Sequence, residues 1–167
     1  DEMSNYFDAF RIDHILGFFR IWSIPINAVE GIMGRFVPAL PVHINEFYER
    51  NTWFDYNRYT KPFINDAVLY EFFGETATFV KEEYLQPGHY SQYELKAEFD
   101  TQRKIEIFFE SLEPNDYNLR IKHGLYDLLS NVILFEEDNS DAKKFHFRFA
   151  IDSTASFRHL DWNTQQQ

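Results

Sequence analysis

The sequence predicts an α+β fold that is mainly helical and carries a β-hairpin near its C-terminus. Between residues 61 and 132, apolar side chains recur at the helical period. Over 145–151 the period changes to two, because phenylalanines alternate with other residues. With 44% hydrophobic and 19% aromatic residues among 167, the chain can bury the core of one ordinary domain.

Four helices are predicted in the middle of the chain. The first follows Pro62 and stops at Gly74, and the second covers 76–85. Thr101 is expected to cap the third, and Asp116 to open the fourth, which is longer. We interpret their apolar stripes as core rather than as a cofactor-binding surface. The stripes are Ile64, Ala67, Val68 and Phe72; Ile105, Phe108, Phe109 and Leu112; and Ile121, Leu125, Leu128, Leu129 and Val132.

The hairpin is predicted from two apolar runs, 132–135 and 145–151. The acidic connection between them lacks the glycine and the closing glutamate of an EF-hand loop, so a solvated turn is expected there rather than a calcium site. Near the end of the chain, Asn163 or Thr164 is a candidate helix N-cap. Both chain ends read as internal to a longer protein.

Composition argues against several classes of function. Lys and Arg number 16 and Asp and Glu 27, and the net charge of −11 repels nucleic acid and anionic membranes. The chain has no cysteine, and its six histidines lack metal-ligand spacing, so we expect no metal site. No P-loop, G-x-G-x-x-G or G-x-S-x-G motif is present, and no cofactor is expected. Cytoplasmic location is the default expectation.

Charged side chains interrupt an apolar segment near the N-terminus. Residues 6–13 read as a short buried strand, and 27–41 as a loop with one helical turn. In a strand, Arg11 and Asp13 project from the same face and can share one pocket. The guanidinium would keep the Asp13 carboxylate ionised, as a nucleophile requires, although a structural ion pair explains the spacing equally well. His14 falls on the opposite face or begins a loop.

The aromatic residues near this cluster suggest a sugar ligand. Sugar C–H faces stack on rings, and sugar hydroxyls bind carboxylates, amides and Arg. Most of the rings are nevertheless expected in the core. The candidates for a carbohydrate cleft beside Asp13 are Phe18, Trp22, Phe36, Trp53 and Tyr56.

Four motifs follow one another within about thirty residues: R-I-D-H-I-L-G, W-S-I-P, A-V-E-G and G-R-F-V. Their order resembles the segment around the nucleophile in the 4-α-glucanotransferase (amylomaltase) family of α-amylase-like (β/α)8 enzymes. The longer form is most similar to the disproportionating enzymes of plant cytosol and some bacteria, which carry an insertion after the nucleophile. The resemblance implies that residues 1–41 are a piece of the catalytic barrel, with 6–13 as one barrel strand, and that 42–167 are the helical insertion with its hairpin.

The resemblance also implies roles for single residues. Asp13 would be the catalytic nucleophile and Arg11 its charge partner, while His14 and Trp22 would contact the bound glucan. The implied reaction is a retaining transfer between α-1,4-glucans, with maltose or maltodextrin as donor and a glucan as acceptor. Ser23 stands where the family often has glutamate, which leaves the role of that position open.

The acid/base glutamate of the family and its surrounding motif are not found in the sequence. Because a retaining mechanism needs two carboxylates, we expect this chain alone to be inactive. The insertion is expected to shape either the acceptor side of the cleft or a subunit contact. In the second case the protein would be a homo-oligomer. The alternatives are a non-catalytic glucan-binding module, in which Asp13→Asn would leave binding intact, and a protein-interaction domain, which no α-glucan would perturb.

Overall fold

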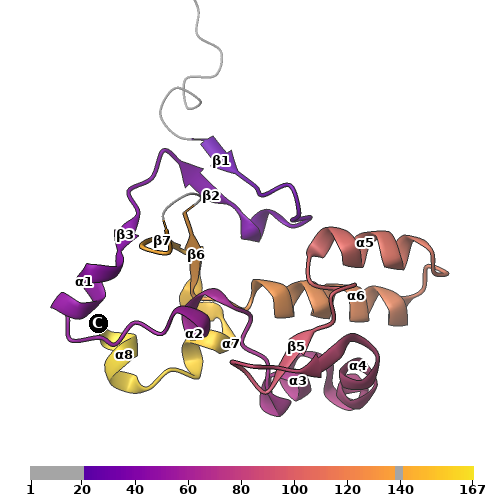
Figure 1. The fold of residues 1–167 in the computed structure, drawn as a ribbon. Coiled ribbons are helices and arrows are strands. Elements are labelled where there is room, and N and C mark those ends of the chain that lie inside the picture. The colour runs from indigo at the N-terminus through magenta and orange to yellow at the C-terminus, as the bar shows by residue number, and fades with distance from the viewer. Residues whose placement is uncertain (1–20, 138–140) are drawn as a thin grey trace, which may run out of the picture.

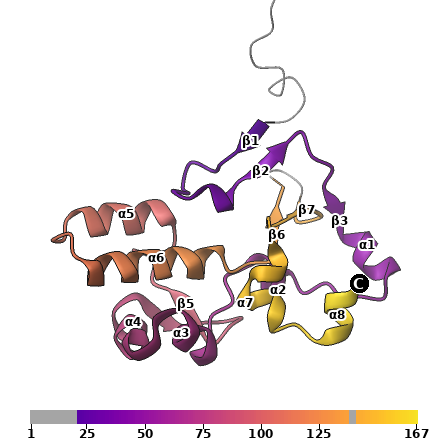
Figure 2. The ribbon, with the colours of Figure 1, turned by 180° about the vertical axis from the view of Figure 1, so that it is seen from behind.

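A computed structural model describes residues 21–137 and 141–167. Short helices and small antiparallel sheets form two parts, each around its own buried cluster. A separate β-hairpin, residues 21–37, lies beside them (Figures 1 and 2). No closed barrel is formed within these ranges. The predicted barrel strand 6–13 lies outside them. None of the described helices is long and apolar enough to cross a bilayer.

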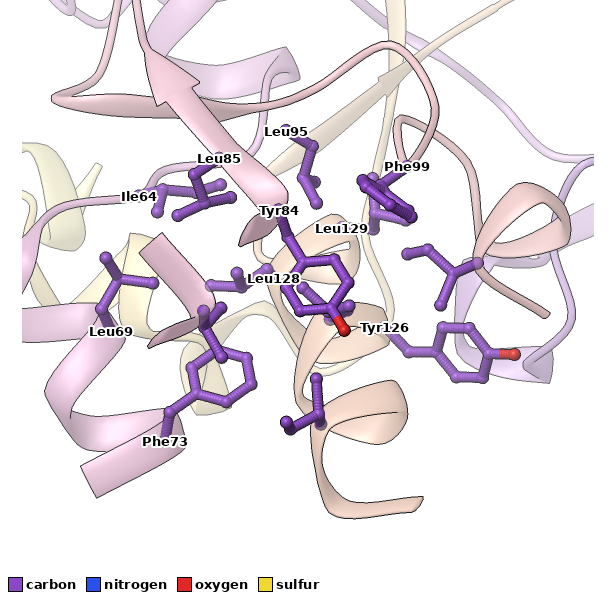
Figure 3. Packing of buried hydrophobic residues seen from close by; sticks show 14 of the residues in the cluster. Ile64, Leu69, Phe73, Tyr84, Leu85, Leu95, Phe99, Tyr126, Leu128 and Leu129 are labelled. Atoms are coloured by element: carbon purple, nitrogen blue, oxygen red, sulfur yellow. The ribbon is translucent and has the colours of Figure 1, made fainter. Parts of the chain in front are cut away.

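The helical part contains four α-helices and one two-stranded sheet. The elements are α3 (Asp66–Phe73), α4 (Ala77–Tyr84), β4 (Leu85–Pro87), β5 (Tyr93–Leu95), α5 (Gln102–Glu110) and α6 (Asp116–Ser130). A short 3-10 helix, η4 (Gly74–Thr76), joins α3 to α4. Figure 3 shows the apolar side chains of this part gathered in a common interior. Val80, Ile105, Leu125 and Leu128 are fully buried there.

The third and fourth predicted helices are confirmed. Thr101 caps α5 by accepting a hydrogen bond from the Lys104 N–H, and α6 begins at Asp116 as expected. The whole predicted stripe of α6, with Val132 after it, is buried. On α5 the stripe is only partly correct, because Phe108 is 37% exposed.

The first predicted helix starts later than expected. It begins at Asp66 because the Asn65 side chain accepts a hydrogen bond from the Val68 N–H at 2.8 Å and so caps it. The buried face of the helix is formed by Val68, Leu69 and Phe73, so Ala67 is exposed and its expected core position is wrong. Gly74 ends the helix as predicted, with a φ of 55° that suits a residue without a Cβ.

The sheet part is built on the three-stranded order β3–β7–β6. Strands β6 (Leu134–Glu136) and β7 (Lys144–Phe147) pair antiparallel and confirm the predicted hairpin. Strand β3 (Val42–His43) adds to β7 and was not predicted. Four short helices surround this sheet: α1 (Ile44–Glu49), α2 (Tyr56–Thr60), α7 (Ala155–Arg158) and α8 (Trp162–Gln166). A 3-10 helix, η5 (Ile151–Ser153), precedes α7, and the cap of α8 is Asp161 rather than the predicted Asn163 or Thr164.

The phenylalanines of the C-terminal run do not share one buried face. Phe145 is fully buried, whereas Phe147 and Phe149 are 51% and 58% exposed. Arg148 is buried instead, because its guanidinium donates to the carbonyl oxygens of Ser130 at 2.8 Å and Phe149 at 2.6 Å. Strand β7 therefore ends at Phe147. Phe149 lies at the surface beside the hairpin of residues 21–37.

Candidate functional site

The hairpin formed by β1 (Ile21–Ser23), β2 (Arg35–Val37) and the loop between them contains three of the four motifs. Trp22 pairs with Phe36, and Ser23 with Arg35. The Trp22 ring meets Phe36 edge-to-face, with ring centroids 4.8 Å apart, and meets Phe149 at 5.9 Å. Trp22 also donates its Nε1–H to the Gly31 carbonyl oxygen at 2.9 Å. This tryptophan therefore holds the loop between the two strands.

The close packing of this loop explains the glycine of G-R-F-V. A side-chain carbon at Gly34 would lie 2.8 Å from the Ser23 carbonyl oxygen and would overlap the Trp22 indole. Gly34 follows a 3-10 helix, η3 (Gly31–Met33), which confirms the predicted helical turn within 28–33. The motif thus encodes a close approach of the backbone to the indole ring.

The predicted catalytic cluster is not described by the structure. Arg11, Asp13 and His14 lie outside the described residues, as does Phe18. Trp22 is described, and it lies in strand β1 of the hairpin above.

The expected sugar-binding rings make separate contacts. Trp22 and Phe36 pack together, but Trp53 is 80% exposed on the connection between α1 and α2, with Tyr48 as a ring neighbour. Tyr56 donates its hydroxyl to the Glu136 carboxylate at 2.6 Å. This bond is the main reason that the Tyr56 pKa is raised. Tyr56 and Glu136 both belong to the sheet part.

The loop after W-S-I-P is bound to the first turn of helix α5. The Gln102 Oε1 accepts hydrogen bonds from the backbone N–H groups of Val29 at 2.8 Å and Glu30 at 2.9 Å. The Arg103 backbone N–H donates to the Asn27 carbonyl oxygen at 3.0 Å. Figures 1 and 2 show the loop between β1 and β2 lying next to α5. We call residues 27–30 the docked loop.

The glutamate of A-V-E-G takes part in this contact. Gln102 Nε2 donates to the Glu30 carboxylate at 3.3 Å, and His123 Nδ1 of helix α6 lies 3.7 Å from the other carboxylate oxygen. Two other glutamates of the chain have structural contacts as well. Glu46 accepts from the His43 N–H in a capping box, and Glu71 pairs with Arg158.

A groove of about 520 Å³ is lined mainly by the segment that contains α2, by the segment around β5 and by the end of α6. Among the described residues, Met33 is the one lining residue from the motif region, three positions after the docked loop. The opposite side is aromatic and polar, and Tyr90 there is 64% exposed. Its lining includes Asn57, Lys61, Phe63 and Glu94. Within the described ranges, no group of three or more His, Asp or Glu side chains could hold a metal ion.

Gln102 and Arg103 are functional candidates that the sequence does not reveal. Gln102 follows a helix cap, a position that suggests only a helix start. Its partners are 72 and 73 residues away along the chain, and no spacing rule links them. Only the folded arrangement brings the docked loop onto α5.

Comparison with known proteins gives a family for this chain. The profile of the 4-alpha-glucanotransferase family matches residues 1–144. The chain is 37% identical over 164 residues to 4-alpha-glucanotransferase DPE2 of Oryza sativa subsp. japonica. That alignment covers 96% of this chain and 17% of the relative, so the chain spans about a sixth of the relative's length. No solved structure matches the chain significantly.

The matched range contains all four motifs, the docked loop and helix α5, and it ends at the start of β7. More than half of the chain is therefore covered by one family profile, and a relative at 37% identity agrees with it. The chain belongs to the 4-alpha-glucanotransferase family.

Proposed function

We propose that the protein containing this chain transfers glucosyl or maltooligosyl units between α-1,4-glucans. The observation that carries the proposal is the family match over residues 1–144, which includes R-I-D-H-I-L-G. Asp13 attacks the anomeric carbon while a glutamic acid outside the matched motifs protonates the departing glycosidic oxygen. The hydroxyl of an acceptor glucan then attacks the glycosyl–Asp13 ester and returns its proton to that glutamate.

Arg11, His14 and Trp22 assist Asp13 in this proposal. Arg11 holds the nucleophile ionised, and His14 contacts the bound glucosyl unit. Trp22 acts through its ring, because its N–H already donates to the Gly31 carbonyl oxygen.

The 167-residue chain itself is proposed to be inactive. A retaining transfer needs an acid/base carboxylate on the leaving-group side of the bond. Three glutamates on the C-terminal side of the nucleophile motif make other contacts: Glu30 in the docked loop, Glu46 in a helix cap and Glu71 with Arg158. None of the three is surrounded by the family's acid/base motif.

The test compares the full-length protein with this chain on maltotriose and on a longer maltodextrin. The full-length protein is expected to produce both shorter and longer glucans without net gain of reducing ends, whereas the chain produces none. Chromatography resolves the products, and a reducing-end assay separates transfer from hydrolysis. Net hydrolysis, or binding without turnover by the full-length protein, overturns the proposed function. Turnover by the purified 167-residue chain overturns its proposed inactivity.

We also propose that the insertion, residues 42–167, contacts the acceptor glucan at the groove beside Met33. The groove combines an exposed ring with amide, ammonium and carboxylate groups, which is the chemistry that sugars bind. Its lining residue Met33 comes three positions after the docked loop, which follows the nucleophile motif closely in sequence.

Tyr90→Ala in the full-length enzyme is expected to raise the KM for the acceptor about fivefold, since loss of a stacked ring costs about 1 kcal/mol. The measurement is initial transfer rate against acceptor concentration at fixed donor. Tyr70→Ala is the matched control, because Tyr70 is 71% exposed on α3 and does not line the groove. An unchanged acceptor KM with an altered oligomeric state would assign the groove to a subunit contact instead.

A further inference from the structure

The docked loop is bound to α5 through one backbone group from each of its four residues. Arg103 binds the carbonyl oxygens of Asn27, through its backbone N–H at 3.0 Å, and Ala28, through its guanidinium at 3.4 Å. Gln102 binds the next two N–H groups, those of Val29 and Glu30, with one amide oxygen. Two adjacent residues of α5 therefore bind one backbone group of each residue in the docked loop.

Two residues of the contact are buried, and both functions of the Gln102 amide are used. Gln102 is 2% exposed and Ala28 is 7% exposed. A side-chain amide oxygen has two lone pairs, and both are used here by backbone N–H donors. The amide nitrogen donates to Glu30, and the first-turn N–H of Arg103, which has no partner inside its helix, donates to Asn27. Loss of Gln102 would leave two N–H groups without acceptors.

A short series of contacts connects Gln102 to the strand that follows the nucleophile motif. The docked loop ends next to Gly31, whose carbonyl oxygen accepts the Trp22 indole N–H. Trp22 lies in β1, and in the sequence β1 comes shortly after R-I-D-H-I-L-G. Gln102 therefore fixes the position of the docked loop, and the docked loop in turn fixes the position of the Trp22 ring.

We propose that Gln102 is a positioning residue for glucan transfer, and that the insertion serves as the support on which the loop after the nucleophile is held. This inference rests on the proposed function. Gln102 touches neither the substrate nor the reacting atoms in this role. It acts through the Val29 and Glu30 backbone and through Trp22, and it makes the insertion necessary for kcat.

The experiment uses four variants of the full-length enzyme. Gln102→Leu keeps the approximate size and removes both hydrogen-bond functions, so kcat is expected to fall roughly tenfold to a hundredfold. Gln102→Glu keeps the acceptor but places a carboxylate against Glu30, and it should be impaired as well. Glu30→Gln alone removes the charge that faces His123 and is expected to have a smaller effect. The double variant combines Gln102→Glu with Glu30→Gln, so the amide now at position 30 can donate to the carboxylate now at position 102. Its kcat should return to within about threefold of wild type.

A structural role alone would not produce this pattern of rescue. The KM for the acceptor should change much less than kcat, because the groove residues are untouched. Gln166→Leu is the matched control, since Gln166 is exposed on α8 and does not line the groove. Its kcat should equal that of wild type.

Hydrogen exchange gives a readout that is independent of activity. Peptides covering 27–31 should exchange faster in Gln102→Leu than in wild type, and the double variant should restore the protection. A kcat for Gln102→Leu within twofold of wild type overturns the inference, and so does a double variant no better than Gln102→Glu. If wild type shows no transfer, the proposed function fails, and unchanged exchange in Gln102→Leu then refutes the docking role separately. If Gln102→Leu does not fold, the comparison of Gln102→Glu with the double variant still tests the inference.

Discussion

Asp13→Asn in the full-length enzyme is expected to abolish glucan transfer. An amide cannot form the glycosyl ester on which a retaining double displacement depends, so the reaction loses its covalent intermediate. A loss of roughly a thousandfold or more corresponds to about 4 kcal/mol of transition-state stabilisation. The measurement is disproportionation of maltotriose, followed by the appearance of longer and shorter glucans.

Asp152→Asn is the matched control for this substitution. Asp152 is an exposed residue of the 3-10 helix η5, and its replacement should leave transfer unchanged. Glucan binding is measured in parallel. A protein that only binds glucan would show no turnover in wild type and equal binding in both variants. Turnover by Asp13→Asn at the wild-type rate would remove Asp13 from the mechanism.

The elements that the sequence predicts well are those in which local signals agree. Helix α6 has a polar first turn at Asp116, a long apolar stripe and a length of 15 residues, and tertiary contacts only reinforce it. In α3, by contrast, the predicted start at Pro62 competes with Asn65 as a cap. The Asn65 side chain accepts the Val68 N–H, so the cap determines the start.

The features that the sequence does not predict depend on distant partners. Strand β3 is two residues long and exists because it pairs with β7, about a hundred residues later. Arg148 lies in an alternating run that indicates an exposed position. Its side chain is buried instead, because it donates hydrogen bonds to the carbonyl oxygens of Ser130 and Phe149. Gln102 is the same case at the candidate site, because only folding brings it to the docked loop.

Asn131→Ala is expected to lower the free energy of unfolding of this chain by about 3 kcal/mol, the cost of leaving two buried backbone groups unpaired. Asn131 is 2% exposed. Its Nδ2 donates to the Phe63 carbonyl oxygen at 2.8 Å, and its Oδ1 accepts from the Ser156 N–H at 2.7 Å. Urea unfolding followed by circular dichroism measures the change. Asn163→Ala, on an exposed position of α8, should stay within about 0.5 kcal/mol of wild type.

The position of Asn131 makes this substitution a test of how the two parts are joined. Leu129 belongs to the helical cluster and Ile133 to the sheet cluster, and Asn131 lies between them in the chain. Its side chain connects the segment before α3, through Phe63, to α7, through Ser156. If these bonds couple the two clusters, the transitions followed by tryptophan fluorescence and by circular dichroism should separate in Asn131→Ala, whereas they coincide in wild type. The loss of about 3 kcal/mol then applies to the transition followed by circular dichroism. A single transition at the wild-type midpoint would mean that apolar packing alone joins them.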